Sequence, residues 1–190
     1  GMDLLDDGSL LVAVANGASF FSSTSGRILR LVDADDDGVA EQQQELGSLS
    51  IGGPTALTRI DDLLFVTGQG KPIIILRLGP APDYSLRQIG RLSISGSGDW
   101  LHPNSALAAR RAPDDADVIE LYFPLGSKVN FAPTTDTRSM STDFGLTGPL
   151  AGDAIHRVRL TDDGTTITGI DHVQIATGLR SASGLAFHPQ

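Results

Sequence analysis

The sequence predicts an all-β chain, because its apolar residues come in short runs and none of these runs has helical spacing. Each run has the length of a strand, and Gly, Asp, Pro and Ser punctuate the chain between them. No run continues an i, i+3, i+4 apolar pattern for three helical turns. The predicted strands are residues 9–15, 27–32, 62–68, 72–78, 86–94, 117–125, 154–160, 165–170, 172–178 and 184–189.

Several of these strands are apolar on both sides of the pleat, notably at residues 10–15, 73–76 and 118–123. A strand with one face in water alternates between apolar and polar residues, so burial on both faces requires sheets that stack on sheets. Sandwiches and propellers both provide such stacking.

An internal repeat separates these two architectures. The stretches "SGRILRLVDADDDGVAEQQQEL" and "GDAIHRVRLTDDGTTITGIDHVQIATGL" share a Gly followed by an Ile-x-Arg strand, an acidic turn with Gly, and a closing segment. Repeated strand units on the order of 40–60 residues are typical of propeller blades. We therefore predict a β-propeller-type fold, with a large sandwich of irregular strands as the alternative.

The repeat divides the chain into three blade-like antiparallel sheets. The units are residues 3–50, 51–95 and 102–178, and residues 179–190 start a fourth. Three blades do not close a ring, so we expect half of a propeller or a fragment of one. Exposed sheet edges favour association, and we expect a second copy or missing blades to cover them.

Composition excludes several classes of function. The net charge is −9 and lysine occurs only at positions 71 and 128, so the basic stripe of a nucleic-acid binder is absent. The lack of cysteine excludes disulfides and thiolate metal sites. The apolar runs are too short to span a membrane, and the first residues do not have the pattern of a signal peptide.

An acidic run resembles the start of a calcium-binding EF-hand loop. Asp33, Asp35, Asp37 and Gly38 occupy its first, third, fifth and sixth positions. The twelfth position, which needs a bidentate Glu, holds Gln44, and no helix is predicted to enter the loop. We interpret the run as a turn between strands, with loose Ca²⁺ binding by the three aspartates as the alternative.

Two further features are candidates for a site. His102 lies in a Gly- and Pro-rich loop after Trp100, whereas His156 lies inside a predicted strand and is interpreted as a packed residue. Residues 126–153 are predicted to form one long loop, and such loops are either functional or flexible polar insertions. Its candidate side chains are Lys128, Asn130 and Arg138.

Three stretches resemble the soluble pyrroloquinoline-quinone (PQQ)-dependent glucose/sorbosone dehydrogenases, which are six-bladed β-propellers. "GRILRLVDADDDGVAE" resembles that family's Gly-x-Ile/Leu-x-Arg strand with its Asp- and Gly-rich turn. "GLRSASGLAFHP" resembles its Gly-Leu-Arg-Asn segment and the following Gly-Leu-Ala-Phe-x-Pro. "LHPNSALA" places a His shortly before the first strand of a blade, as the family does.

The resemblance implies an oxidoreductase site for a sugar hydroxyl and an extracytoplasmic location. It makes His102 the general base, and Arg180 the residue that holds the PQQ quinone oxygen, with Ser181 in place of the family's Asn. Pro103 after His102 is a second departure. The family's other cofactor and calcium ligands would lie in blades that this chain lacks. The opposing interpretation is a non-catalytic propeller domain that binds a ligand or a protein.

Overall fold

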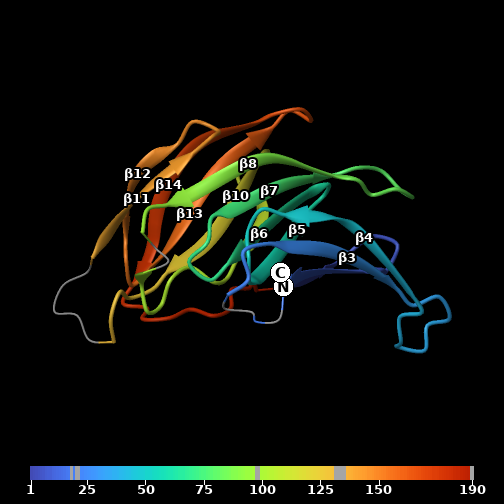
Figure 1. Cartoon of the computed structure of the whole chain (residues 1–190). Coiled ribbons are helices and arrows are strands. Elements are labelled where there is room, and N and C mark those ends of the chain that lie inside the picture. The colour runs from blue at the N-terminus through green and yellow to red at the C-terminus, as the bar shows by residue number, and fades with distance from the viewer. Residues whose placement is uncertain (18, 20–21, 97–98, 131–135, 189–190) are drawn as a thin grey trace.

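The computed structural model describes residues 1–17, 19, 22–96, 99–130 and 136–188, and it confirms the all-β prediction. Its fourteen strands pair antiparallel in three sheets, which fan out in chain order (Figure 1). The described residues contain no α-helix. Within this part of the chain there is accordingly no helix of the length and apolarity needed to cross a membrane.

The first sheet is a meander in which each strand pairs with the next along the chain. Its innermost strand β1 is short, and the β3–β4 pair contains a bulge after Ile28. The strands are β1 (Met2–Leu4), β2 (Leu10–Ala15), β3 (Gly26–Val32) and β4 (Gln42–Leu49).

The second sheet is also a meander, and a hairpin from later in the chain extends it. β11 pairs with β8, so that the strand order is β12-β11-β8-β7-β6-β5. The strands are β5 (Pro54–Ile60), β6 (Leu63–Gly68), β7 (Ile73–Leu78), β8 (Leu86–Ile94), β11 (Thr137–Thr142) and β12 (Thr147–Ala151).

The third sheet is interrupted in sequence by that hairpin. β10 and β13 are neighbours in the sheet, although the β11–β12 hairpin separates them in the chain. The strands are β9 (Ala108–Ala112), β10 (Asp115–Leu125), β13 (Ala154–Asp162) and β14 (Ile167–Thr177). Residues 137–151 therefore leave the third sheet and belong to the second.

Two hydrophobic cores lie on opposite faces of the second sheet. Leu64, Val66 and Ile74 face the first sheet, whereas Phe65 and Ile75 face the third. Every residue of β6 is buried. This double-sided burial explains why the predicted strands were apolar on both sides of the pleat.

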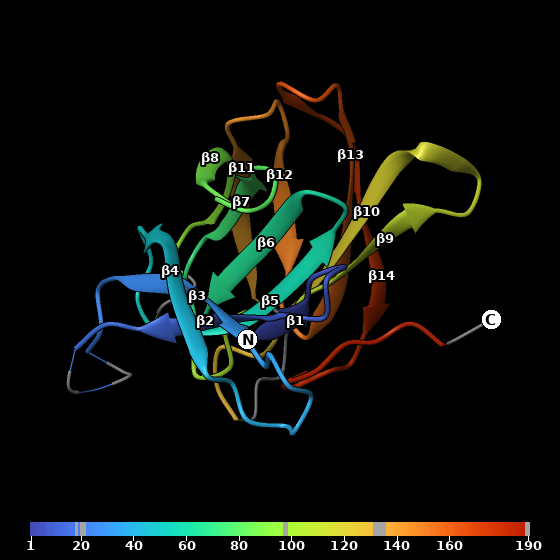
Figure 2. The same ribbon diagram turned by 90° about the vertical axis from the view of Figure 1, so that its right-hand side faces the viewer.

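The first strands of successive sheets lie against one another. β5 contacts β1 and β2 of the first sheet and β9 of the third. Figure 2 shows β1, β5 and β9 close together near the middle of the molecule. The sheets are therefore blade-like, because each begins near a shared centre and adds its later strands outward.

Arginine–aspartate pairs connect the turns of neighbouring sheets. Arg59 in β5 pairs with Asp6 at 2.5 Å, and Arg111 in β9 pairs in the same way with Asp61 at 2.5 Å. A third pair, Arg77 with Asp162, is largely shielded from water. The acidic turns at the ends of the predicted strands thus carry the polar contacts between sheets.

The structure differs from the sequence predictions at several places. β1, β5 and β9 were not predicted, and the predicted strands 165–170 and 172–178 form the single strand β14. The predicted loop at 126–153 is wrong for residues 137–151, which form β11 and β12. β4 includes residues 42–46, which were not among the predicted strands. The segment at 184–188 is not a strand, although Phe187 packs edge-on against Tyr122 at a centroid distance of 5.3 Å.

Two histidines join the hairpin to the third sheet. His156 is almost fully buried, its ring stacks on Phe123, and its Nε2 lies 2.8 Å from the carbonyl oxygen of Ala151 in β12. Because Nε2–H must donate to that carbonyl, Nδ1 is unprotonated and accepts from Nε2 of His172 at 3.4 Å. The His156 ring is therefore neutral in this arrangement, and His172 carries a proton on Nε2.

We predict that acid destabilises the protein through these two histidines. Burial lowers the pKa of His156. Burial also lowers the pKa of His172, and the negative charge of Asp171 offsets only part of that shift. The unfolded chain therefore binds more protons than the folded one as the pH falls below about 6.5, so the free energy of unfolding decreases in that range. Urea unfolding at pH 7.5 and 5.5 measures this change.

The control separates these rings from other titrating groups. The double variant His156→Gln/His172→Gln should show a smaller difference between the two pH values, whereas His188→Gln, at an exposed position, should keep the wild-type difference. An equal pH dependence in all three proteins would contradict the prediction.

Candidate functional site

Three loops meet at one end of the third sheet and form the candidate active site. The amide of His102 donates to the carbonyl of Ser127 at 3.0 Å, and the amide of Ser127 donates to the carbonyl of Arg180 at 2.9 Å. Gly126 is needed between them, because an added Cβ would lie 2.4 Å from the carbonyl oxygen of Arg180. Backbone contacts therefore hold segments from three parts of the chain side by side.

This arrangement brings His102 and Arg180 into contact, although they lie 78 residues apart. Arg180 Nε donates to His102 Nε2 at 3.0 Å. Asn130 Oδ1 lies 3.3 Å from the same ring nitrogen. Arg180 and Asn130 therefore both contact His102 at its Nε2 atom. The family resemblance selected His102 and Arg180, and Asn130 comes from the predicted long loop.

The contact fixes the protonation of the histidine ring. A guanidinium is a donor only, so His102 Nε2 must be the acceptor, and the single ring proton lies on Nδ1. Asn130 then needs its amide turned, so that an N–H rather than Oδ1 faces the ring nitrogen. The lone pair on Nε2, which a general base would use, is directed at Arg180.

The other candidate loop residues make contacts elsewhere. Lys128 pairs with Asp136 at 3.6 Å. The guanidinium of Arg138 lies over the Trp100 ring, 5.1 Å from its centroid. Trp100 is buried, and its ring packs so closely on Gly152 that a Cβ added there would lie 2.7 Å from it. Ser181 follows Arg180 in the same segment and is exposed.

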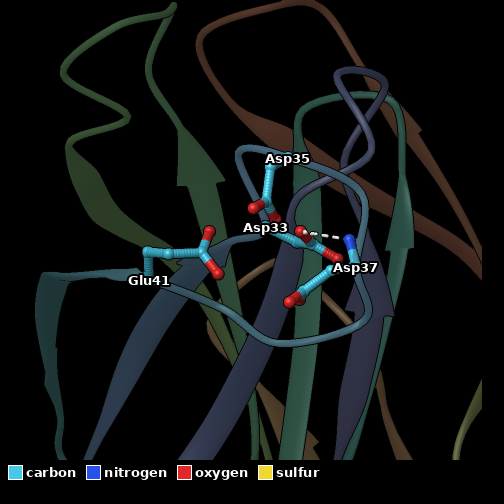
Figure 3. Close-up of side chains that lie close together, drawn as sticks. All are labelled: Asp33, Asp35, Asp37 and Glu41. Atoms are coloured by element: carbon cyan, nitrogen blue, oxygen red, sulfur yellow. Dashed lines mark hydrogen bonds between the residues drawn. The ribbon is translucent and has the colours of Figure 1, made fainter.

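A second candidate site lies in the β3–β4 loop, which extends beyond the sheets at the right of Figure 1. Carboxylate oxygens of Asp33, Asp35, Asp37 and Glu41 all lie within 4.8 Å of one another (Figure 3). The backbone amides of residues 37 and 38 donate to Asp33 at 3.2 and 2.7 Å. These bonds curl the loop, so that the side chains converge.

Glu41, the fourth carboxylate of this group, was not among the residues predicted from the sequence. Counting to the twelfth position of an EF-hand reached Gln44, whose side chain donates to the carbonyl of Asp83. Glu41 stands at the ninth position, which also contributes to such loops, and it accepts from the amide of Ala34 at 2.8 Å. The signal was present in the spacing Asp-x-Asp-x-Asp-Gly-x-x-Glu.

The two candidate sites are separate. The acidic loop belongs to the first sheet and the His102–Arg180 pair to loops of the third, with the second sheet packed between those sheets.

Comparison of the chain with protein-family models, with curated proteins and with solved structures finds no match. Function must therefore be argued from the two sites themselves.

We predict that Arg180 sets the tautomer of His102. In the wild-type protein the neutral ring should carry its proton on Nδ1, because Nε2 accepts from Arg180. In Arg180→Ala that acceptor is released, and the population of the Nε2–H tautomer should rise. Two-bond ¹⁵N–¹H correlation spectra of the histidine ring report both forms.

A matched variant tests whether the effect belongs to this contact. Arg138→Ala removes an arginine that lies over Trp100 rather than over His102, so the His102 tautomer should not change. A wild-type ring with its proton on Nε2 would contradict the geometry.

Proposed function

We propose that this chain supplies part of an oxidoreductase site that converts a sugar hydroxyl to a carbonyl, as in the PQQ-dependent sugar dehydrogenases that it resembles. The contact between Arg180 and His102 at 3.0 Å carries the proposal. Oxidation of an alcohol needs a base for the hydroxyl proton and an acceptor for the hydride. A neutral imidazole can supply the base, and a permanent cation beside it can hold an acceptor that becomes anionic.

The residues present fit a bound quinone on chemical grounds. PQQ carries carboxylates and quinone oxygens, and Arg180 offers an exposed guanidinium whose terminal nitrogens have no hydrogen bond to another described residue. When bound, PQQ would supply the two-electron acceptor for the hydride. Arg180 and Ser181 are the residues we propose to hold it, and further blades or a second copy would complete its site.

In this scheme the two side chains have different roles. Arg180 binds an oxygen that becomes more negative during the reaction, and a permanent donor placed there stabilises that charge. His102 takes the hydroxyl proton on Nε2 once the guanidinium has turned from the ring toward the cofactor. Asn130 is placed to orient the ring or the hydroxyl, since its amide lies 3.3 Å from Nε2.

We predict that the chain binds PQQ in the presence of Ca²⁺ and that the two variants separate binding from catalysis. Trp100, the single tryptophan, lies buried beside the site and reports binding by fluorescence. Arg180→Ala should weaken PQQ binding at least about tenfold, because it removes a charged donor. His102→Ala should bind PQQ normally, and in the assembly that completes the site it should lose dye-linked glucose oxidation by about 100-fold or more.

The control is His188→Ala, which removes an exposed histidine outside the site and should leave both measurements unchanged. Sugar oxidation that survives His102→Ala would overturn the role of the base. Absence of PQQ binding in the wild-type chain would favour the non-catalytic propeller domain instead.

A second proposal concerns the acidic loop, which we infer binds Ca²⁺ loosely. Four carboxylates with oxygens within 4.8 Å of one another provide the hard oxygen ligands that this ion prefers. The loop is exposed and lacks the bidentate twelfth ligand of an EF-hand, so an affinity in the range of roughly 10⁻⁴–10⁻³ M is expected.

Substitutions within the loop test this second proposal. Glu41→Gln should weaken Ca²⁺ binding at least about fivefold by calorimetry, since it removes one charged ligand. Asp36→Asn is the matched control, because it removes the same charge from the same loop at a position outside the cluster. Equal losses in the two variants would show only an effect of net charge and would contradict a site.

A further inference from the structure

Charged side chains are distributed unevenly between the two ends of the strands in the second and third sheets. Carboxylates stand at or just before the first residues of β6, β10 and β14, and these are Asp62, Asp115 and Asp163. A cation follows the last residue of each of the same strands by three positions, and these cations are Lys71, Lys128 and Arg180. Both lysines of the chain are among them. Each of these strands therefore starts beside a carboxylate and ends beside a cation.

The loops at the cationic ends of these strands lie side by side. The amide of Gly70 donates to the carbonyl of Asn104 at 3.1 Å, and the Asn104 side chain donates to the carbonyl of Lys71 at 2.8 Å. The segment that holds Asn104 also holds His102, so the loop after β6 adjoins the candidate active site. We call this surface the loop end, and it comprises residues 68–72, 99–104, 126–130, 136–138, 151–153 and 178–180.

Three cations of the loop end, Lys71, Arg138 and Arg180, form no ion pair with a carboxylate of the described residues. Arg180 donates to the neutral ring of His102, and Arg138 lies over the ring of Trp100. Elsewhere in the part of the chain that the structure describes, eight of ten arginines pair with Asp or Glu. Cations without a carboxylate are therefore concentrated at the loop end.

The loop end also holds fewer carboxylates than cations. Its carboxylates are Asp99, Asp136 and Asp153, and Asp136 is already paired with Lys128 at 3.6 Å. Four cations thus stand against three carboxylates on this surface, although the whole chain has a net charge of −9. A protein with this distribution of charge repels anions from most of its surface and directs them to the loop end.

The cations without carboxylates are arranged around His102. Arg138 lies over the side chain two residues before this histidine, and Lys71 is linked to the residue two places after it. Arg180 contacts the ring itself at 3.0 Å. Lys71 and Arg180 are both exposed, so their charges are open to a ligand. A ligand that brings a hydroxyl to His102 therefore meets positive charge at several points around that hydroxyl.

We propose that the loop end binds an anionic sugar, which is a sugar that carries a carboxylate or a phosphate group. The sugar part of this ligand rests on the proposed oxidoreductase function, whereas its charge follows from the cations alone. Under that function Arg180 is engaged by the cofactor, so Lys71 and Arg138 are the cations left for the anionic group of the substrate. Hydrogen bonds from Lys or Arg to carboxylate or phosphate are stronger than those to neutral groups. We expect the anionic sugar to bind at least about tenfold more tightly than a neutral one.

Titrations of the full chain with glucose, glucuronate and glucose 6-phosphate test the proposal without the cofactor. Trp100 is buried under Arg138 and reports binding by its fluorescence. Both anionic sugars should bind at least about tenfold more tightly than glucose, and their two affinities separate a preference for carboxylate from one for phosphate. A rise in salt from about 20 to about 300 mM should weaken the binding of the anionic sugars and leave that of glucose unchanged.

Single substitutions locate the effect. Lys71→Gln and Arg138→Gln should each weaken the binding of the anionic sugars at least about threefold and leave that of glucose unchanged. Lys71 is exposed, so its variant should fold, and circular dichroism checks both proteins. Arg87→Gln is the matched control, because Arg87 is exposed, has no ion pair with a described carboxylate, and lies near the start of β8, away from the loop end. It should bind all three sugars as the wild type does.

Equal affinities of the wild-type chain for glucose and the two anionic sugars would overturn the proposal, as would a lack of binding by the anionic sugars. An equal loss in Arg87→Gln would show only an effect of net charge and would also contradict it. Failure of the proposed function gives a different result. Binding of the anionic sugars by a chain that does not bind PQQ would support the anion site and contradict the oxidoreductase. PQQ binding without a preference for anionic sugars would do the reverse.

Discussion

Burial of the second sheet on both faces is the constraint on which the rest of the structure depends. β6 alternates between the two cores, with Leu64 toward the first sheet and Phe65 toward the third, and both side chains are fully removed from water. A sheet of this kind leaves little room for polar groups on its central strands. Its charged side chains, such as Arg59 in β5 and Arg77 in β7, pair with aspartates at or near the strand ends of the neighbouring sheets. At about 25 cal/mol per Å² of apolar surface, the two cores are the main source of stability, and the surface ion pairs add little.

Both candidate sites use loops whose ends are fixed by this scaffold. Loops that carry function are commonly positioned by a rigid framework. The His102–Arg180 contact depends on main-chain hydrogen bonds that hold three loops in parallel, and on Gly126, where a side chain would separate them. The acidic loop instead organises itself, because Asp33 accepts from two amides further along the same loop. The first site is therefore sensitive to the packing of the third sheet, whereas the second is local to one hairpin.

The apolar strands could be predicted from the sequence and the polar ones could not, for a physical reason. The buried strand at 63–68 is apolar at almost every position and was predicted within one residue. Strands such as 137–142, with the sequence TRSMST, bury one side chain and have no periodic apolar signal. Their formation depends on pairing with β8, which is a tertiary contact that a local pattern does not contain. The family resemblance selected His102 and Arg180 for separate roles, but their contact was not predicted, since no spacing rule connects residues 78 positions apart.

The β11–β12 hairpin has a consequence for how the protein folds. It leaves the chain between two neighbouring strands of the third sheet, pairs with β8 of the second, and receives a hydrogen bond from Gly169 of β14 at its Phe144 carbonyl. The second sheet therefore cannot reach its full width before β9 and β10 of the third sheet have been made. Neither sheet can open alone without breaking the hairpin's contacts to the other. We expect these two sheets to unfold as one cooperative unit, so that their protected amides exchange with solvent together. The described residues of the first sheet share no such hairpin with another sheet, and we expect that sheet to open more readily.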